Sequence, residues 1–147
     1  MRAVVTRVKS ASVTIDGSVT AKIDGGFLVL LGVHKDDTEK EAVRLADKVC
    51  GLRVFEDENG KMNLNLEKVG GKILVVSQFT LYADCKSRRP GFIEAARPDT
   101  AIPLYEFFMA ECVKHGFEVE HGQFGADMLV SSENDGPVTL IMDTNEL

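Results

Sequence analysis

The pattern of apolar and polar residues over the first third of the chain predicts β-strands. Apolar residues alternate with polar ones on both sides of a turn: Val13 and Ile15 before Asp16-Gly17, and Val19, Ala21 and Ile23 after it. Alternation of period two is typical of a half-buried strand, and Asp-Gly between two such runs favours a hairpin. We expect Asp24-Gly25-Gly26 to turn the chain again into the apolar run FLVLLGV, so that residues 1–33 form a meander.

Residues 38–51, TEKEAVRLADKVCG, have the apolar spacing of a helix. The apolar residues recur three and four positions apart, at Ala42, Leu45, Ala46, Val49 and Cys50. Thr38 and Glu41 are spaced as a capping box, and Gly51 is suited to end a helix. The sequence therefore predicts an amphipathic helix over this range.

A second helix is predicted after the loop that is rich in arginine and proline. Asp99 or Thr100 can cap it, and Pro103 is tolerated if it lies in the first turn. Its apolar stripe is expected at Tyr105, Phe108, Met109, Cys112 and Val113, and its end at His115-Gly116.

The other apolar runs predict a hairpin and four further strands. LRVFED and KMNLNL flank Glu58-Asn59-Gly60, Gly70-Gly71 leads into KILVV, and FEVEH, DMLVSS and PVTLIMD supply three closing strands. The order of elements predicts a mixed α/β fold in a single domain over residues 1–147. We expect mixed sheets or a barrel-like β core with two main helices packed on one side, layered α/β/β.

Composition and charge limit the kinds of partner and location. The chain has 147 residues, 44% of them hydrophobic, and a formal net charge of -6, so a polyanion must be bound by a local basic patch. Its three cysteines lack metal-ligand spacing, which fits a reducing compartment. No apolar run approaches the roughly 18–20 residues of a membrane span, and MRAVVTRVKS lacks the apolar core of a secretory signal. We expect a cytoplasmic protein without a membrane partner.

The strand KILVV ends in Ser77, Gln78 and Thr80, which is unusual for a buried strand. An unpaired buried polar side chain costs roughly 1–3 kcal/mol. These side chains therefore either satisfy one another and the nearby backbone or are held ready for a ligand.

Nucleophilic catalysis at this strand end would need a general base such as histidine. His34, His115 and His121 lie in no recognisable motif, so a catalytic triad is poorly supported. Thr80 or Ser77 as a nucleophile stays open. No zinc motif or acidic calcium loop is present, and we expect no metal and no cofactor.

Cys85 is another candidate nucleophile, because the neighbouring cations Lys86, Arg88 and Arg89 could lower its pKa. Cys50 and Cys112 fall on apolar helix faces and are expected in the core. The three cations could also bind phosphate, for which arginine is well suited. The alternative is a solvated loop.

Gly136-Pro137 introduces the last apolar run. It is either a simple turn or a cis peptide, because X-Pro bonds adopt cis at modest cost. A cis Gly-Pro would present consecutive backbone carbonyls with no side chain in front of them.

The chain resembles the D-aminoacyl-tRNA deacylases. The segments that carry the resemblance are SQFTL at residues 77–81 and NDGPVT at residues 134–139, with RVKSASVTIDG, GFLVLLGVHKDD and KMNLNL matching in place. The resemblance covers essentially the whole chain. It implies a homodimeric cytoplasmic enzyme that hydrolyses the ester between a D-amino acid and the 3′ end of tRNA.

The resemblance also assigns roles to residues. Ser77, Gln78, Phe79 and Thr80 would line the catalytic pocket that holds the terminal adenosine and the ester. A cis Gly136-Pro137 turn, supported by Arg7, would reach into the pocket of the partner subunit as the chiral selector. The loop YADCKSRRPGF departs from the family pattern, being one residue shorter and carrying Gly91 in place of Ser. We expect Lys86, Arg88 and Arg89 to bind tRNA because of their concentrated charge in an acidic chain.

These roles account for the missing triad. The substrate's 2′-hydroxyl can assist hydrolysis while the protein orients it and donates hydrogen bonds. A wall of carbonyls at Gly136 and Pro137 would reject the Cβ of every L-amino acid and leave glycine as a substrate. A non-enzymatic module that binds the tRNA 3′ end, or a hydrolase with Thr80 as covalent nucleophile, remains an alternative.

Overall fold

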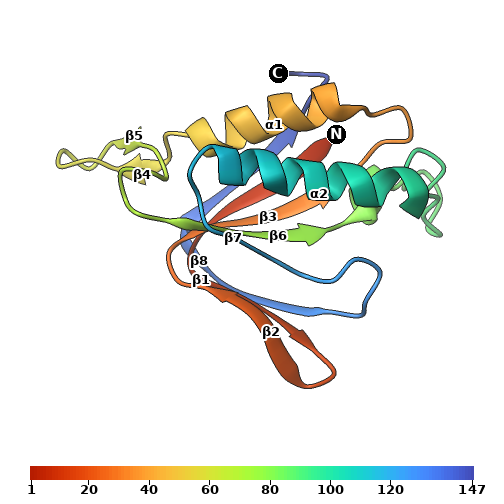
Figure 1. Ribbon diagram of the computed structural model, residues 1–147, viewed down its shortest axis with the longest axis horizontal. Coiled ribbons are helices and arrows are strands. Elements are labelled where there is room, and N and C mark those ends of the chain that lie inside the picture. The colour runs from red at the N-terminus through yellow and green to blue at the C-terminus, as the bar shows by residue number, and fades with distance from the viewer.

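The computed structural model describes residues 1–147 as a mixed, curled sheet with two helices on one side (Figure 1). The strands are β1 (Arg2–Ile15), β2 (Ser18–Ile23), β3 (Gly26–Gly32), β4 (Phe55–Glu56), β5 (Met62–Leu64), β6 (Lys72–Ser77), β7 (Val119–His121) and β8 (Leu129–Asp143). The helices are α1 (Glu39–Gly51), α2 (Pro98–Lys114) and the short 3₁₀ helix η1 (Phe79–Tyr82). The predicted mixed α/β class with a barrel-like β core and two helices on one side is confirmed. Neither α-helix has the length and apolar character needed to cross a membrane.

The long strand β1 organises the sheet, and the predicted meander is wrong. β2 pairs with residues 11–15 of β1 and β3 with residues 2–8, on the same edge and in one continuing antiparallel register. Asp24-Gly25 therefore interrupts a long strand without reversing it. The physical reason is the length of β1, whose fourteen residues offer partners to both segments. In Figure 1 the β1–β2 end of this hairpin curls away from the helices.

The last strand, β8, also differs from the prediction. DMLVSS and PVTLIMD are not separate strands, because both pair with the other edge of β1. Two closing strands, β7 and β8, replace the expected three. The ladder is interrupted where Arg7 alone on β1 faces residues 135–138 on β8, between the pairs Thr6↔Thr139 and Val8↔Asn134. We call residues 135–138 the β8 bulge.

The helix predicted at residues 38–51 is confirmed with its cap. The Thr38 hydroxyl accepts from the Lys40 N–H at 3.3 Å, and the Glu41 carboxylate accepts from the Thr38 N–H at 2.7 Å. The hairpin of β4 and β5 around Glu58-Asn59-Gly60 is confirmed as well.

The second helix begins earlier than predicted. Arg97 is its N-cap in an extended conformation and Pro98 is its first residue, a position that favours proline. Pro103 consequently lies inside the helix and not in its first turn. Val113, expected in the apolar stripe, is 56% exposed, and the last buried residue of α2 is Cys112.

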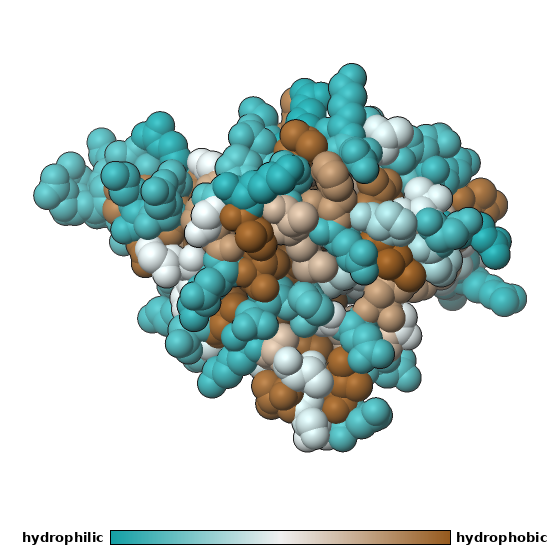
Figure 2. Space-filling view, in the orientation of Figure 1, coloured by the Kyte–Doolittle hydropathy of each residue, from teal (hydrophilic) through white to brown (hydrophobic).

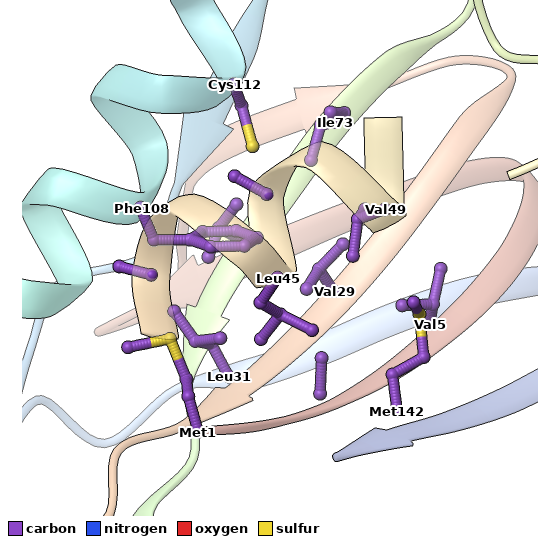
Figure 3. Close-up of a cluster of buried hydrophobic side chains, with 14 of the residues drawn as sticks. Met1, Val5, Val29, Leu31, Leu45, Val49, Ile73, Phe108, Cys112 and Met142 are labelled. Atoms are coloured by element: carbon purple, nitrogen blue, oxygen red, sulfur yellow. The ribbon is translucent and has the colours of Figure 1, made fainter. Parts of the chain in front are cut away.

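The main core lies between the helices and the sheet (Figure 3). Leu45 and Val49 of α1 and Phe108 of α2 pack in one cluster with Val29 and Leu31 of β3. Cys50 and Cys112 are buried in the same cluster, as predicted.

A smaller core lies on the other face of the sheet, where the β1–β2 hairpin curls over it. Its members include Val8 and Val13 of β1, Ile23 of β2, and Leu74 and Val76 of β6. β6 is therefore buried on both faces, which explains its unbroken apolar run and fixes the position of its polar end.

Candidate active site

The strand β6 ends in a tight turn at the edge of the helix layer. Gln78 donates its backbone N–H to the Leu31 carbonyl at 2.8 Å, and η1 then begins at Phe79. A Cβ on Gly32 would lie 3.1 Å from the Gln78 carbonyl and 3.0 Å from the Leu81 Cβ. Glycine at this position of β3 therefore lets the turn lie close against the sheet.

The polar side chains of this turn satisfy one another in part. The Gln78 side-chain amide donates to the Thr80 hydroxyl oxygen. Gln78 is half-buried and Thr80 exposed, so both remain accessible from solvent. The Thr80 hydroxyl is thus held in place by an amide rather than by a general base.

A cleft of about 650 Å³ opens beside the turn. Three segments that are distant in sequence form its walls: Val76–Phe79, then Phe92 with Ala95–Pro98, then Phe124–Met128 with Val130. Of the predicted catalytic residues, Ser77, Gln78 and Phe79 line the cleft, and Thr80 lies next to them. In Figure 2 apolar surface is visible in this region, between the start of α2 and the loop after β7.

Two aromatic rings stand at the mouth of the cleft. The Phe79 and Phe92 rings meet edge to face with centroids 5.0 Å apart, and Phe79 is 52% exposed. Sequence reasoning did not identify Phe92 or the segment 124–130 as parts of the site. No local pattern marks them, because only the tertiary fold brings them to the strand end.

No histidine lines the cleft. The His34 Nε2 lies 2.9 Å from a Glu94 carboxylate oxygen, and the His121 Nδ1 lies 2.6 Å from the Gly122 carbonyl. Asp127 is the one carboxylate among the lining residues. The cleft therefore offers hydrogen-bond donors, amide groups and apolar surface, without a nucleophile and base in contact.

The β8 bulge is built around Arg7. This arginine is 7% exposed, and its guanidinium donates to the Val54 carbonyl at 2.6 Å and to the Asp135 carbonyl at 2.9 Å. The peptide bond between Gly136 and Pro137 is cis, and Gly136 has a φ of +129°. Arg7 thus lies against the Gly-Pro turn, the placement that the resemblance implied.

Asn134, which precedes the bulge and supports it, was not assigned a role from the sequence. Its side chain accepts from the Val138 N–H at 3.0 Å and donates to the Thr139 hydroxyl at 2.9 Å. Asparagine before Asp-Gly-Pro is a turn-forming pattern that could have pointed to it.

Within one chain the bulge and the cleft are not brought together. Arg7, Gly136 and Pro137 are absent from the lining of the cleft. Arg7 pairs with Phe27 at the start of β3, whereas Ser77 pairs with Leu31 near its end.

The three predicted tRNA-binding cations lie on an exposed loop after η1. The loop closes at the bridge between Asp84 and Gly91, whose backbone groups exchange hydrogen bonds of 2.8 and 2.9 Å. Lys86, Arg88 and Arg89 are exposed and make no ion pair. Their charge is available to a ligand.

Comparison with known proteins identifies the family. The model of the family described as D-Tyr-tRNA(Tyr) deacylase matches residues 4–143. This chain belongs to the D-aminoacyl-tRNA deacylase family. The family predicted from the sequence is thereby confirmed, and with it the enzyme class, a D-aminoacyl-tRNA deacylase.

Similar proteins match this chain over nearly their full length. A D-aminoacyl-tRNA deacylase of Thermus aquaticus is 59% identical over 147 residues, which cover 99% of this chain and 97% of that protein. One of Thermosipho africanus is 53% identical over 148 residues, covering 100% and 99%. Among solved structures, a c-Myc DNA unwinding element binding protein is 40% identical with a TM-score of 0.92, covering 97% of this chain and 98% of that one. A probable eukaryotic D-amino acid tRNA deacylase is 17% identical with a TM-score of 0.84 over 96% of this chain and 97% of that one, a likeness of fold.

Proposed function

We propose that this protein releases D-amino acids, and glycine, from tRNA by hydrolysing the ester at the terminal adenosine. The observation that carries the proposal is the cleft at the end of β6, where Ser77, Gln78 and Phe79 form one wall and Phe92 faces Phe79. Family membership supports the reaction class. We place the terminal adenosine and the ester in this cleft.

The chemistry of the cleft favours stabilisation of the transition state over covalent catalysis. The first N–H groups of a 3₁₀ turn have no partner within the turn, so those of Phe79 and Thr80 can donate to the developing oxyanion. The Thr80 hydroxyl accepts from Gln78 and contacts no base. The substrate's 2′-hydroxyl then assists the attack of water or stabilises the leaving oxygen.

Under this mechanism, loss of the Thr80 hydroxyl and loss of the substrate's 2′-hydroxyl should have different effects on activity. Thr80→Ala is expected to keep substantial activity, whereas a tRNA that lacks the terminal 2′-hydroxyl should be nearly inert. Single-turnover deacylation rates measure both. An acyl-enzyme trapped on Thr80 would contradict this mechanism and establish covalent catalysis.

We propose a homodimer in which the Gly136-Pro137 turn of each subunit enters the cleft of the other. Two observations support it. The fifteen residues of β8 pair only with β1 and leave the other edge of the strand open, and Ile141 on this strand is 77% exposed. An open edge of this length offers unpaired backbone N–H and C=O groups to a second subunit, whose contact would also cover Ile141.

In this arrangement the carbonyls of Gly136 and Pro137 form a wall against an L side chain. A wall recognises an L-amino acid by its Cβ, and glycine has none, so glycyl-tRNA should be cleaved much faster than L-alanyl-tRNA. Rejection by collision does not require the pocket to grip any D side chain.

Side-by-side hydrolysis of D-tyrosyl-, L-tyrosyl-, glycyl- and L-alanyl-tRNA tests the activity and the filter together. We expect release of D-tyrosine and glycine and retention of both L-amino acids. Glycine as resistant as L-alanine would contradict the steric wall.

The exposed cations Lys86, Arg88 and Arg89 are proposed to contact tRNA phosphates. They concentrate positive charge in a chain of net charge -6. This supports local rather than general attraction of RNA. We also propose that residues 1–147 act as one domain in the cytoplasm, where charged tRNA is used.

A nucleic-acid binding module is the second candidate. It is favoured by the structural relative whose name describes binding to a DNA element. Release of no amino acid from any of the four substrates, with tRNA binding retained, would support it over hydrolysis.

A further inference from the structure

A second cavity lies directly behind one wall of the cleft. It measures about 320 Å³ and is formed by η1 and the loop of residues 84–94, and we call it the loop cavity. Phe92 and Ala95 line the cleft, whereas Gly91, Ile93 and Glu94, from the same stretch of chain, line the loop cavity. A single segment of backbone therefore separates the two hollows.

The available charge in the loop cavity is positive. Lys86 and Arg89 line it and have no carboxylate partner. The Glu94 carboxylate is occupied by Lys35 at 3.1 Å and His34 at 2.9 Å. The cavity's other carboxylate, Asp84, accepts the backbone N–H of Lys86 at 2.9 Å. Lys86 and Arg89 therefore remain without an ion-pair partner, against the single carboxylate of Asp84 that no cation pairs, and the cavity keeps a net positive charge that suits a phosphate group.

One further feature indicates that a ligand completes this cavity. Ile93 is 84% exposed although it lines a hollow. A ligand with an apolar face beside its anionic group would cover this side chain.

We infer that the loop cavity binds the penultimate nucleotide of an RNA 3′ end. The phosphodiester that joins it to the terminal adenosine lies against Lys86 and Arg89, and its base covers Ile93. The inference rests on the proposed function, which places the terminal adenosine in the cleft. Two hollows separated by one segment of chain suit two successive nucleotides of a single strand, and the cations that line the loop cavity suit the phosphate between them.

The affinities of three small ligands test the inference without any catalysis. Titration calorimetry with adenosine, adenosine 5′-monophosphate and the dinucleotide CpA isolates the phosphate and then the second base. We expect the monophosphate to bind about tenfold more tightly than adenosine through charge-assisted hydrogen bonds. CpA should gain about a further fivefold from the apolar contact. Equal affinities for the three ligands would overturn the inference.

Substitutions show which residues provide each of the two gains in affinity. The double variant Lys86→Ala/Arg89→Ala should abolish the gain from adenosine to the monophosphate, and the gain should fade with salt in the wild type. Ile93→Asn should abolish the gain from the monophosphate to CpA. Arg44→Ala, a matched control at an exposed arginine on α1 without an ion pair, should keep both gains. If the variants retain both gains, the nucleotide binds elsewhere and the inference is wrong.

Failure of this inference is distinguishable from failure of the proposed function. Hydrolysis of D-tyrosyl-tRNA with no affinity gain for CpA would overturn the nucleotide site alone. Both affinity gains without deacylation of any substrate would support the nucleotide site and reject the hydrolysis.

Discussion

Removal of the Arg7 guanidinium should loosen the β8 bulge and destabilise the fold. Arg7 is 7% exposed and donates two hydrogen bonds, to the Val54 carbonyl at 2.6 Å and the Asp135 carbonyl at 2.9 Å. A hydrogen bond from a charged donor contributes roughly 1.5–3 kcal/mol. The Asp135 carboxylate at 3.7 Å is partly exposed, so its attraction to Arg7 adds little.

From these two contacts we expect Arg7→Ala to lower the free energy of unfolding by about 3–6 kcal/mol. For a chain of this size that corresponds to a fall in Tm of roughly 6–24 °C. Arg7→Lys keeps the charge but lacks the planar fork that reaches both carbonyls, so it should lose about half as much.

Urea and thermal unfolding followed by circular dichroism at one protein concentration would measure these losses. Lys9→Ala is the matched control, because Lys9 is an exposed cation on the same strand and makes no ion pair. It should change stability by less than about 0.5 kcal/mol. An Arg7→Ala protein as stable as this control would refute the structural role assigned to the guanidinium.

Two further predictions concern acid stability and close backbone contact. Burial raises the pKa of Asp143, but hydrogen bonds from a backbone N–H and from Arg2 outweigh it and leave the pKa below its usual value. Its stabilising contribution is therefore present above about pH 4 and lost as pH falls through the lowered pKa, so Asp143→Asn should lose less stability between pH 6 and pH 2 in urea titrations. A Cβ on Gly26 would lie 1.9 Å from the Lys72 carbonyl, whereas one on Gly25 would have 3.9 Å to its nearest neighbour. Gly26→Ala should therefore abolish soluble expression while Gly25→Ala remains folded, and equal Tm values for the two would contradict the contact.

Local sequence signals predicted those elements whose stabilising contacts join residues that are close together in the sequence. The capping box of Thr38 and Glu41 fixed the start of α1, and the turn at Asn59-Gly60 fixed the β4–β5 hairpin. Ser77 to Thr80 were identified as a group because they are contiguous and follow an apolar strand.

Elements whose partners are far away in the sequence could not be predicted from local patterns. β2 and β3 join in one register, and β8 forms a single strand across its bulge, because β1 pairs with all three. Two walls of the cleft come from residues 92–98 and 124–130, which carry no polar pattern of their own. Their contribution depends on how α2 and the loop after β7 pack beside β6.

The β8 bulge constrains the kinds of genetic change that this region can accept. Four residues face one residue of β1 between the pairs Thr6↔Thr139 and Val8↔Asn134. Side chains alternate between the two faces of a strand, so a deletion of one codon would shift Thr139–Asp143 by one position along β1. That shift would turn Leu140 and Met142 away from the helices and expose them to solvent. Substitutions within residues 135–138 leave this alternation intact, so drift in this turn should proceed by replacement of residues, while its length stays constant.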